Sequence, residues 1–144
     1  MNNRIYLDNC CFNRPYDDQS YLTIKLESEA KLFVQKEILE GTFELVWSFI
    51  LDYENAMNPY NDRKQAIQKW RSIAKLEINN SDELFDLAKE FMSSGFKNND
   101  ALHMASAVTA NCDFFLTTDK GILNKQVDGP IIINPIDFVR ALEA

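Results

Sequence analysis

Hydrophobic positions along the chain follow two different periods, one typical of strands and one typical of helices. Short apolar or β-branched runs predict five strands, at residues 4–8, 43–47, 74–78, 113–117 and 131–133. Between them, apolar residues recur every three to four positions and indicate helices, at residues 20–40, 48–56, 63–73 and 101–110, with others starting at Ser81, near Ile122 and at Pro135. Strands separated by helices throughout predict a parallel sheet with helices on both faces.

Local signals predict where several helices begin and end. Ser48 and Ser81 are expected N-caps, and Gly41 is expected just after the C-terminus of the long second segment. We expect the helix over 101–110, which is nearly apolar all round, to be deeply buried and to be capped by residues 98–100. The longest stretch without predicted structure is residues 9–19, and loops of that length are often functional.

Length and composition predict one domain over residues 1–144, without a linker or an internal repeat. Apolar residues make up 46% of the chain and charged residues 26%, ordinary values for a globular protein. No apolar run approaches the length of a membrane span, and the polar start lacks the apolar core of a signal peptide. The expectation from these features is a cytoplasmic protein that does not associate with membranes.

The cysteines and the net charge bear on the state of the thiols and on affinity for nucleic acid. Cys10 and Cys11 are adjacent, Cys112 stands alone, and none has metal-ligand spacing, so we expect free thiols. The net charge is −7, from 22 acidic against 15 basic residues, which predicts weak nonspecific affinity for nucleic acid. Two explanations stay open: the acids gather in a metal site, or nucleic acid is not the partner.

Four acids occupy informative places in the predicted elements. Asp8 ends the first strand, Glu54 lies in the helix after the second, Asp100 precedes the apolar helix, and Asp119 follows the fourth strand. Ligands of open α/β sheets bind at the carboxyl ends of strands, where the strand order reverses. Converging carboxylates suit Mg²⁺ and the hydrolysis of phosphodiesters. Each acid alone also has an ordinary structural explanation, as a cap, a turn residue or a solvated helix acid.

Several short motifs, taken together, resemble the PIN-domain family across the whole chain. They are Tyr6-Leu7-Asp8-Asn9, Ser48 with Glu54, residues 99–107, residues 115–119, and residues 13–19, the last resembling a bacterial subset. The resemblance implies a three-layer α/β/α, Rossmann-like fold with a parallel sheet in the order 3-2-1-4-5. It also implies that Asp8, Glu54, Asp100 and Asp119 bind Mg²⁺ or Mn²⁺ in a ribonuclease site. Many small members are toxins of toxin–antitoxin pairs, and small members are often dimers.

Neighbouring residues leave alternatives. Asp52 precedes Glu54 by two positions and points about 200° away around a helix, so we prefer Glu54. Asp113 begins the fourth strand and is expected at the opposite edge of the sheet. Secondary candidates for contacts to water or phosphate are Asn9, Thr117, Thr118 and Arg14. His103 lies one turn after Asp100, and we interpret it as a packed histidine and not as a catalyst.

The hypothesis that joins these features is a metal-dependent endoribonuclease that hydrolyses RNA and is the toxin of a toxin–antitoxin pair. The main alternative is a catalytically idle, metal- or protein-binding PIN-like module. A phosphorylatable receiver-like module ranks below both, because residues 79–80 after the third strand are Asn and offer no phosphoacceptor.

Overall fold

The computed structural model describes residues 3–143, which build a five-stranded parallel sheet. Its strands are β1 (Arg4–Leu7), β2 (Glu44–Ser48), β3 (Leu76–Ile78), β4 (Phe114–Leu116) and β5 (Ile131–Ile133). The strand order β3-β2-β1-β4-β5 confirms the order that the sequence resemblance implied. Receiver-like doubly wound sheets have the order 2-1-3-4-5 instead, so the topology excludes that alternative.

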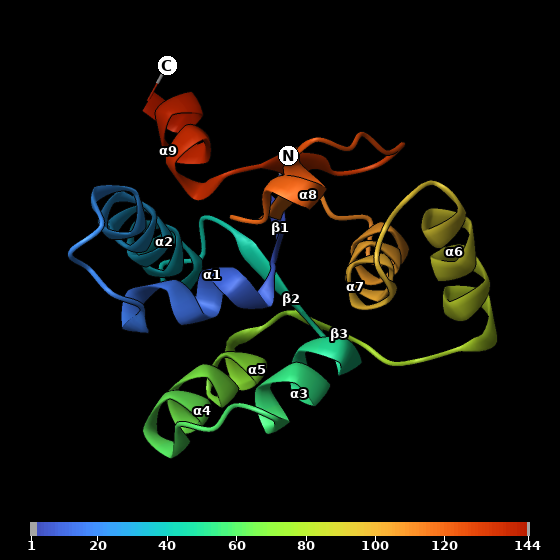
Figure 1. Cartoon of the computed structure of the whole chain (residues 1–144), viewed down its shortest axis with the longest axis horizontal. Helices are drawn as coiled ribbons and strands as arrows, with labels where there is room; N and C mark the ends of the chain where they lie inside the picture. Colours follow the sequence, from blue (N-terminus) through green and yellow to red (C-terminus); the bar gives the residue numbers. More distant parts are fainter. Residues whose placement is uncertain (1–2, 144) are drawn as a thin grey trace.

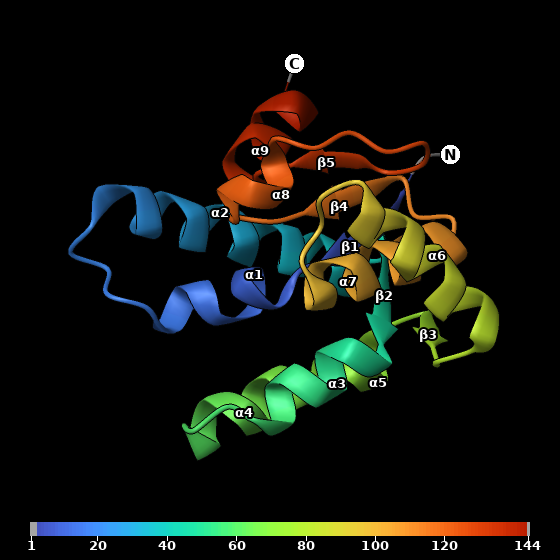
Figure 2. The same ribbon diagram turned by 45° about the vertical axis from the view of Figure 1, so that its right-hand side comes forward.

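Helices cover both faces of this sheet, in the three layers expected (Figure 1, Figure 2). They are α1 (Asn9–Asn13), α2 (Leu22–Leu39), α3 (Phe49–Ala56), α4 (Asn61–Gln68), α5 (Trp70–Ile73), α6 (Asp82–Ser93), α7 (Asn98–Thr109), α8 (Lys120–Leu123) and α9 (Pro135–Glu143). On one face α2 packs against α9, and on the other α6 packs against α7. In both ribbon views α3 and α4 lie beyond the carboxyl end of β2.

The core explains why the central strands read as unbroken apolar runs. Parallel strands with helices on both faces bury every side chain, whichever way it points. Accordingly, the three residues 5–7 of β1 and the residues Phe115 and Leu116 of β4 are fully buried. The apolar helix α7 lies against this sheet with Ala101, Met104 and Ala105 buried, as its composition predicts.

Predicted helix boundaries are confirmed where a specific side chain sets them. Ser48 accepts a hydrogen bond from the backbone N–H of Leu51, and Ser81 accepts one from that of Leu84. Gly41 has φ +87°, the left-handed conformation that ends α2 without the cost of a side chain. These caps fix where α3 leaves β2, and α3 carries Glu54.

Three expectations about local structure are wrong. Residues 9–19 are not a structureless loop: Asp8 accepts a hydrogen bond from the N–H of Asn9 and starts α1, and a 3₁₀ turn, Arg14–Tyr16, follows. Pro15 fits there because the first turn needs no N–H from it. The helix expected over 63–73 is two helices, α4 and α5, that meet at Lys69. Asp100 is not an N-cap, because α7 begins at Asn98 and places Asp100 in its first turn.

The cysteines agree with their sequence expectation. All three cysteines are free thiols, with Cys11 and Cys112 buried and Cys10 half-buried. Burial raises the pKa of Cys112 to about 12, which keeps that thiol protonated and inert. Among the helices of residues 3–143, none is both long and apolar enough to cross a bilayer.

Replacement of Lys31, on α2, is expected to increase the stability of the protein. Its side chain is buried against the Phe12 ring, and this burial lowers the pKa of Lys31 from 10.5 to about 7. The unfolded chain therefore takes up a proton that the folded protein resists, and stability is lost as pH falls from 10.5 to 7. We expect Lys31→Met to raise the free energy of unfolding at pH 7 by on the order of 2 kcal/mol.

Urea unfolding measured from pH 6 to 10 tests this expectation, with Lys36→Met as the control on an exposed position of the same helix. The gain from Lys31→Met should shrink as pH rises toward 10, whereas Lys36→Met should stay within about 0.5 kcal/mol of wild type. A gain that is absent at pH 7, or that does not change with pH, would contradict a neutralised buried lysine.

Candidate metal centre

The strand order reverses between β1 and β4, and two of the predicted acids stand at that reversal. The backbone N–H of Asp8, just after β1, donates to the carbonyl of Leu116 at the end of β4, at 3.0 Å. Asp119 follows β4 by three residues and caps α8 through the N–H of Gly121. The topology therefore brings these residues, 111 positions apart in sequence, to one edge of the sheet.

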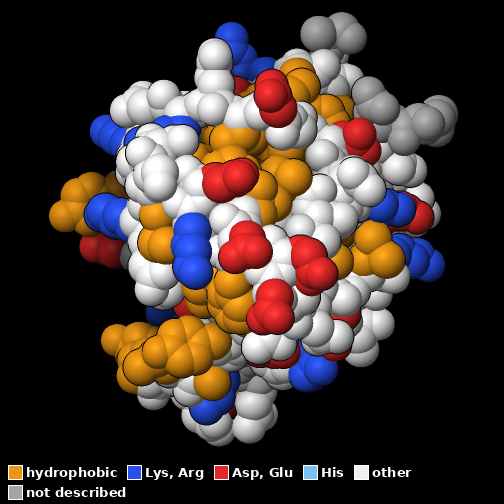
Figure 3. Space-filling view, turned by 90° about the vertical axis from the view of Figure 1, so that its right-hand side faces the viewer, with side chains coloured by type: hydrophobic (Ala, Val, Ile, Leu, Met, Phe, Trp, Pro, Cys, Tyr) orange, Lys and Arg blue, Asp and Glu red, His pale blue; other side chains and the backbone are white. Residues whose placement is uncertain are grey.

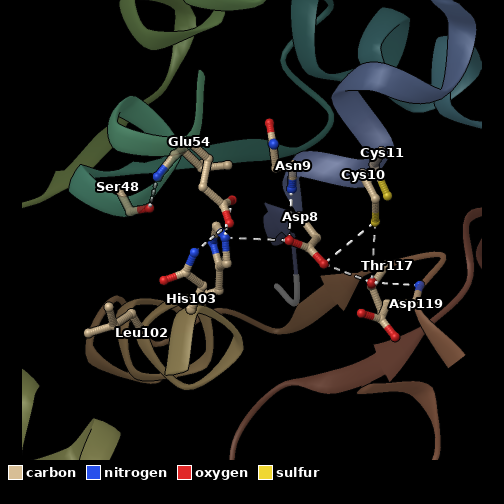
Figure 4. Close-up of polar contacts among 12 residues, drawn as sticks. Asp8, Asn9, Cys10, Cys11, Ser48, Glu54, Leu102, His103, Thr117 and Asp119 are labelled. Atoms are coloured by element: carbon tan, nitrogen blue, oxygen red, sulfur yellow. Dashed lines mark hydrogen bonds and ion pairs between the residues drawn. The ribbon is translucent and has the colours of Figure 1, made fainter. Parts of the chain in front are cut away.

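Asp8 is the most enclosed of the four acids, with only 6% of its surface exposed. Its Oδ1 accepts from the N–H of Asn9 at 2.8 Å, and its Oδ2 accepts from the hydroxyl of Thr117 at 2.9 Å. Thr117 also accepts from the N–H of Asp119 at 3.1 Å, so one buried hydroxyl joins the two acids (Figure 4). These bonds hold the Asp8 carboxylate in one orientation.

Glu54 is held by a chain of buried polar groups. Its Oε1 lies 2.6 Å from Nε2 of His103, and its Oε2 accepts from the Asn99 amide at 3.3 Å. On the other side of the imidazole ring, Nδ1 lies 2.6 Å from the Tyr6 hydroxyl, which in turn lies 2.6 Å from the hydroxyl of Ser48. Figure 4 shows His103 between Glu54 and Asp8. Nε2 of His103 lies 3.6 Å from Oδ1 of Asp8.

Burial and neighbouring negative charges shift the pKa of His103 in opposite directions. Burial lowers its pKa, but the carboxylate of Asp8 and the hydrogen bond to Glu54 outweigh burial, and the pKa of His103 is raised. The imidazole therefore tends toward its protonated form in the absence of any other cation. Among the ion pairs of residues 3–143, His103 is the one cationic partner of Asp8 and Glu54, and Asp100 and Asp119 have none.

Asp100 reports the electrostatic state of the whole cluster. Burial, and then the negative charges of Asp8 and Asp119, raise the pKa of Asp100 to about 6, while His103 acts in the opposite direction. Glu54 also contributes to this rise, so Asp100 is affected by the negative charge of all three other predicted acids. Around Asp100 the acids therefore form an anionic cluster in which His103 is the opposing charge.

A divalent cation fits this donor set. Asp8, Glu54 and His103 each offer one ligand atom, and these three atoms lie within 4.8 Å of one another. Asp100 is not part of this group, but its pKa shows that it is close enough to be affected by Asp8, Asp119 and Glu54. Mg²⁺ and Mn²⁺ take hard oxygen donors and bind through a few carboxylates plus water. Imidazole suits softer metals better, and Nε2 of His103 is engaged with Glu54, so His103 fits an orienting role better than that of a ligand.

The raised pKa of Asp100 predicts that metal binding depends on pH. A ligand carboxyl must lose its proton, so divalent ions should stabilise the protein more as pH rises through about 6. We expect the increase in melting temperature caused by 1 mM Mn²⁺ to be small at pH 5 and to level off above pH 7. Asp100→Asn should reduce this dependence, as measured by thermal unfolding with Mn²⁺ against EDTA, and the part that remains reflects the proton on His103, whose pKa is also raised. A shift of equal size at pH 5 and pH 7 would contradict the assignment.

The secondary candidates lie around the cluster, mostly engaged with protein groups. Arg14 pairs with Asp17 at 3.0 Å and with Glu27 at 3.1 Å, and donates to the hydroxyl of Thr118 at 2.9 Å. These contacts leave Arg14 little capacity to bind a phosphate. The side chain of Asn9 accepts from Asn13 at 3.2 Å and lies next to Asp8 (Figure 4).

Asp52 and Asp113 lie outside the cluster. Asp52 accepts from the indole N–H of Trp47 at 2.8 Å and pairs with Arg71, on the side of α3 away from Glu54. Asp113 accepts from the backbone N–H of Arg4 at the opposite edge of the sheet. The preference for Glu54 over Asp52 is consistent with this geometry.

His103 contributes more to the site than its place in the sequence indicates. It was interpreted as a packed histidine, and it is indeed buried, but it contacts two of the four acids. Its spacing of three residues from Asp100 placed it on the correct helix face. What the sequence did not indicate was the depth of Tyr6, whose hydroxyl fixes the imidazole ring from behind.

The fold and this site define an α/β protein with an acidic, candidate divalent-metal centre at the reversal of strand order. Comparison with models of protein families finds no match, and neither does comparison with curated protein sequences. Among solved structures, the chain is similar to a chain of VapBC2 from Rickettsia felis bound to a DNA fragment from their promoter. The two are 18% identical with a TM-score of 0.54, over 91% of this chain and 98% of that one. This likeness concerns the fold.

Proposed function

We propose that the protein is a PIN-like, metal-dependent endoribonuclease that hydrolyses phosphodiester bonds of RNA. The observation that carries the proposal is the cluster of four carboxylates at the reversal of strand order, which lacks a counter-charge apart from His103. Enzymes that cleave phosphodiesters hold divalent ions with such carboxylates. Likeness of the fold to a VapBC2 chain adds support.

The residues of the cluster have different proposed roles, which depend on their positions. Asp8, Asp100 and Asp119 would hold one or two Mg²⁺ or Mn²⁺ ions, with Glu54 binding directly or through water. When bound, such ions lower the pKa of water and offset the negative charge that builds up on the reacting phosphate. Thr117 fixes the Asp8 carboxylate, and His103 fixes that of Glu54, so both acids are oriented before substrate arrives.

The partners that go with this function are an RNA substrate and a protein inhibitor. The similar structure is a VapBC2 complex bound to promoter DNA, which supports the proposal that this chain is the toxin of a toxin–antitoxin pair and binds an antitoxin. Its place of action would then be the cytoplasm, where RNA is found. A homodimer is part of the same proposal.

The second candidate is a metal- or protein-binding module without catalytic activity, and the charge of the chain favours it. Acidic side chains gather on the face over α6 and α7 (Figure 3), where α6 alone exposes Asp82, Glu83, Asp86 and Glu90. Such a surface repels a polyanion. An inactive module of this kind would be stabilised by Mn²⁺ and would leave RNA intact.

Cleavage of a mixed RNA pool by the purified protein separates the two candidates. The nuclease proposal expects fragments in Mg²⁺ or Mn²⁺ and none in EDTA. Intact RNA under every condition, together with thermal stabilisation by Mn²⁺, would favour the inactive module.

A further inference from the structure

A pocket of about 270 Å³ lies between α3 and α7, directly beside the candidate metal centre. Its lining residues are Phe49, Ile50, Tyr53, Asn98, Asn99 and Leu102. Asn99 belongs to both places, because it lines the pocket and donates to Oε2 of Glu54. In Figure 4, Leu102 and Glu54 lie toward the same end of the site, and Asp119 lies at the other.

The lining combines aromatic rings with amide groups and carries no charged side chain. Tyr53 is 56% exposed, although it stands one position before Glu54 on a well-formed helix. Phe49 shares its face of α3 at a spacing of four residues and is braced edge-on by Phe85, with ring centroids 6.0 Å apart. Exposed Asn98 and half-buried Asn99 offer hydrogen-bond donors and acceptors at the rim.

These properties match a neutral, planar ring with a polar edge. Such a ring stacks on an aromatic side chain, while the amide of an asparagine can pair with its donors and acceptors. A phosphate group fits poorly, because no lysine or arginine lines the pocket and Glu54 is next to it. An apolar side chain would leave the two amides without use.

Because the molecule is negatively charged, stacking on aromatic rings is a suitable source of affinity for RNA. The chain has a net charge of −7, its α6–α7 face is acidic, and Arg14 is engaged by Asp17 and Glu27. Proteins that bind single strands obtain part of their affinity from bases that stack on exposed aromatic residues, and stacking does not require positive charge.

We propose that this pocket binds one unpaired base of the RNA strand, next to the phosphate that enters the metal centre, an inference that rests on the proposed nuclease function. Tyr53 provides the stacking surface, and Asn98 contacts the edge of the base. A base within a duplex is not free to enter such a pocket.

Binding of RNA can be measured separately from cleavage. The probe is a fluorescein-labelled, single-stranded RNA of seven nucleotides, followed by anisotropy in Ca²⁺ and again in EDTA. Tyr53→Ala should weaken binding between about 5-fold and about 150-fold, whereas Tyr53→Phe should stay within about twofold of wild type. Tyr21→Ala is the matched control, because Tyr21 is 64% exposed and does not line the pocket.

Abasic substitution locates the base. Each position of the RNA is replaced in turn by an abasic nucleotide and tested against wild type and Tyr53→Ala. At one position the loss in wild type should be large and the loss in Tyr53→Ala small, because the two changes remove the same contact. Equal losses in both proteins at every position would overturn the proposal.

The outcomes for the pocket and for the nuclease function can be told apart. If wild type cleaves RNA but Tyr53→Ala binds and cleaves equally well, the pocket proposal is wrong and the nuclease proposal stands. Binding that depends on Tyr53, without cleavage in any metal, supports the pocket and contradicts the nuclease. If Tyr53→Ala changes the oligomeric state in gel filtration and leaves RNA affinity intact, the pocket belongs to an interface between copies, which also overturns the proposal.

Discussion

Replacing Asp8 by Asn is expected to reduce metal-dependent RNA cleavage by on the order of 10³-fold while the protein stays folded. Asp8 is the buried acid between His103 and Thr117, and its charge is felt by Asp100. Asn keeps an oxygen that can accept from the N–H of Asn9, and Asn is about as good an N-cap as Asp. The substitution therefore removes the charge and spares the start of α1.

Cleavage rates under single-turnover conditions, with circular dichroism as the check on folding, test this expectation. Asp52→Asn is the matched control, since Asp52 is an acid on α3 that faces Trp47 and Arg71 and lies outside the cluster. We expect it to cleave at close to the wild-type rate. Full activity in Asp8→Asn would show that the cluster is not the catalytic site.

His103→Phe is expected to have the second-largest effect, with metal affinity and cleavage reduced by about 10- to 100-fold. The imidazole holds Glu54 at 2.6 Å and is itself held by Tyr6, so its loss frees the Glu54 carboxylate to rotate.

Tyr6→Phe tests the orientation of His103 separately from its charge. It deletes the hydroxyl that contacts Nδ1 of His103 but keeps the ring that stacks on Phe115. A positioning role for His103 predicts an intermediate loss of Mn²⁺ affinity in Tyr6→Phe, measured by calorimetry, and Ser106→Ala on α7 should bind like wild type. If His103→Phe binds Mn²⁺ within twofold of wild type, the histidine is only a packing residue.

The sequence predicted those parts of the fold that depend on local pattern. Apolar runs marked β1, β2 and β4 because parallel strands are buried on both faces, and Ser48, Ser81 and Gly41 marked helix ends through local hydrogen bonds or backbone conformation. The short helix α1 escaped prediction because its five residues are too few to show a helical period.

From the sequence, the site could be predicted only where the ends of strands and helices place its residues. Asp8 and Asp119 are placed by the topology, and Glu54 by the cap at Ser48, which sets the rotation of α3. The role of His103 depends on contacts across 97 and 49 residues, to Tyr6 and Glu54, and no local pattern records contacts of that range. The same holds for the pocket beside Tyr53, which α3 and α7 form together.

We propose that Asp8, Glu54, Asp100 and Asp119 together hold a divalent ion that RNA cleavage requires. The most direct measurement is the single-turnover cleavage rate of a labelled single-stranded RNA as a function of Mn²⁺ concentration, for wild type, Asp8→Asn and Asp52→Asn. We expect saturable, Mn²⁺-dependent cleavage in wild type and Asp52→Asn and almost none in Asp8→Asn. Cleavage that persists in EDTA, or that Asp8→Asn retains at the wild-type rate, would contradict it.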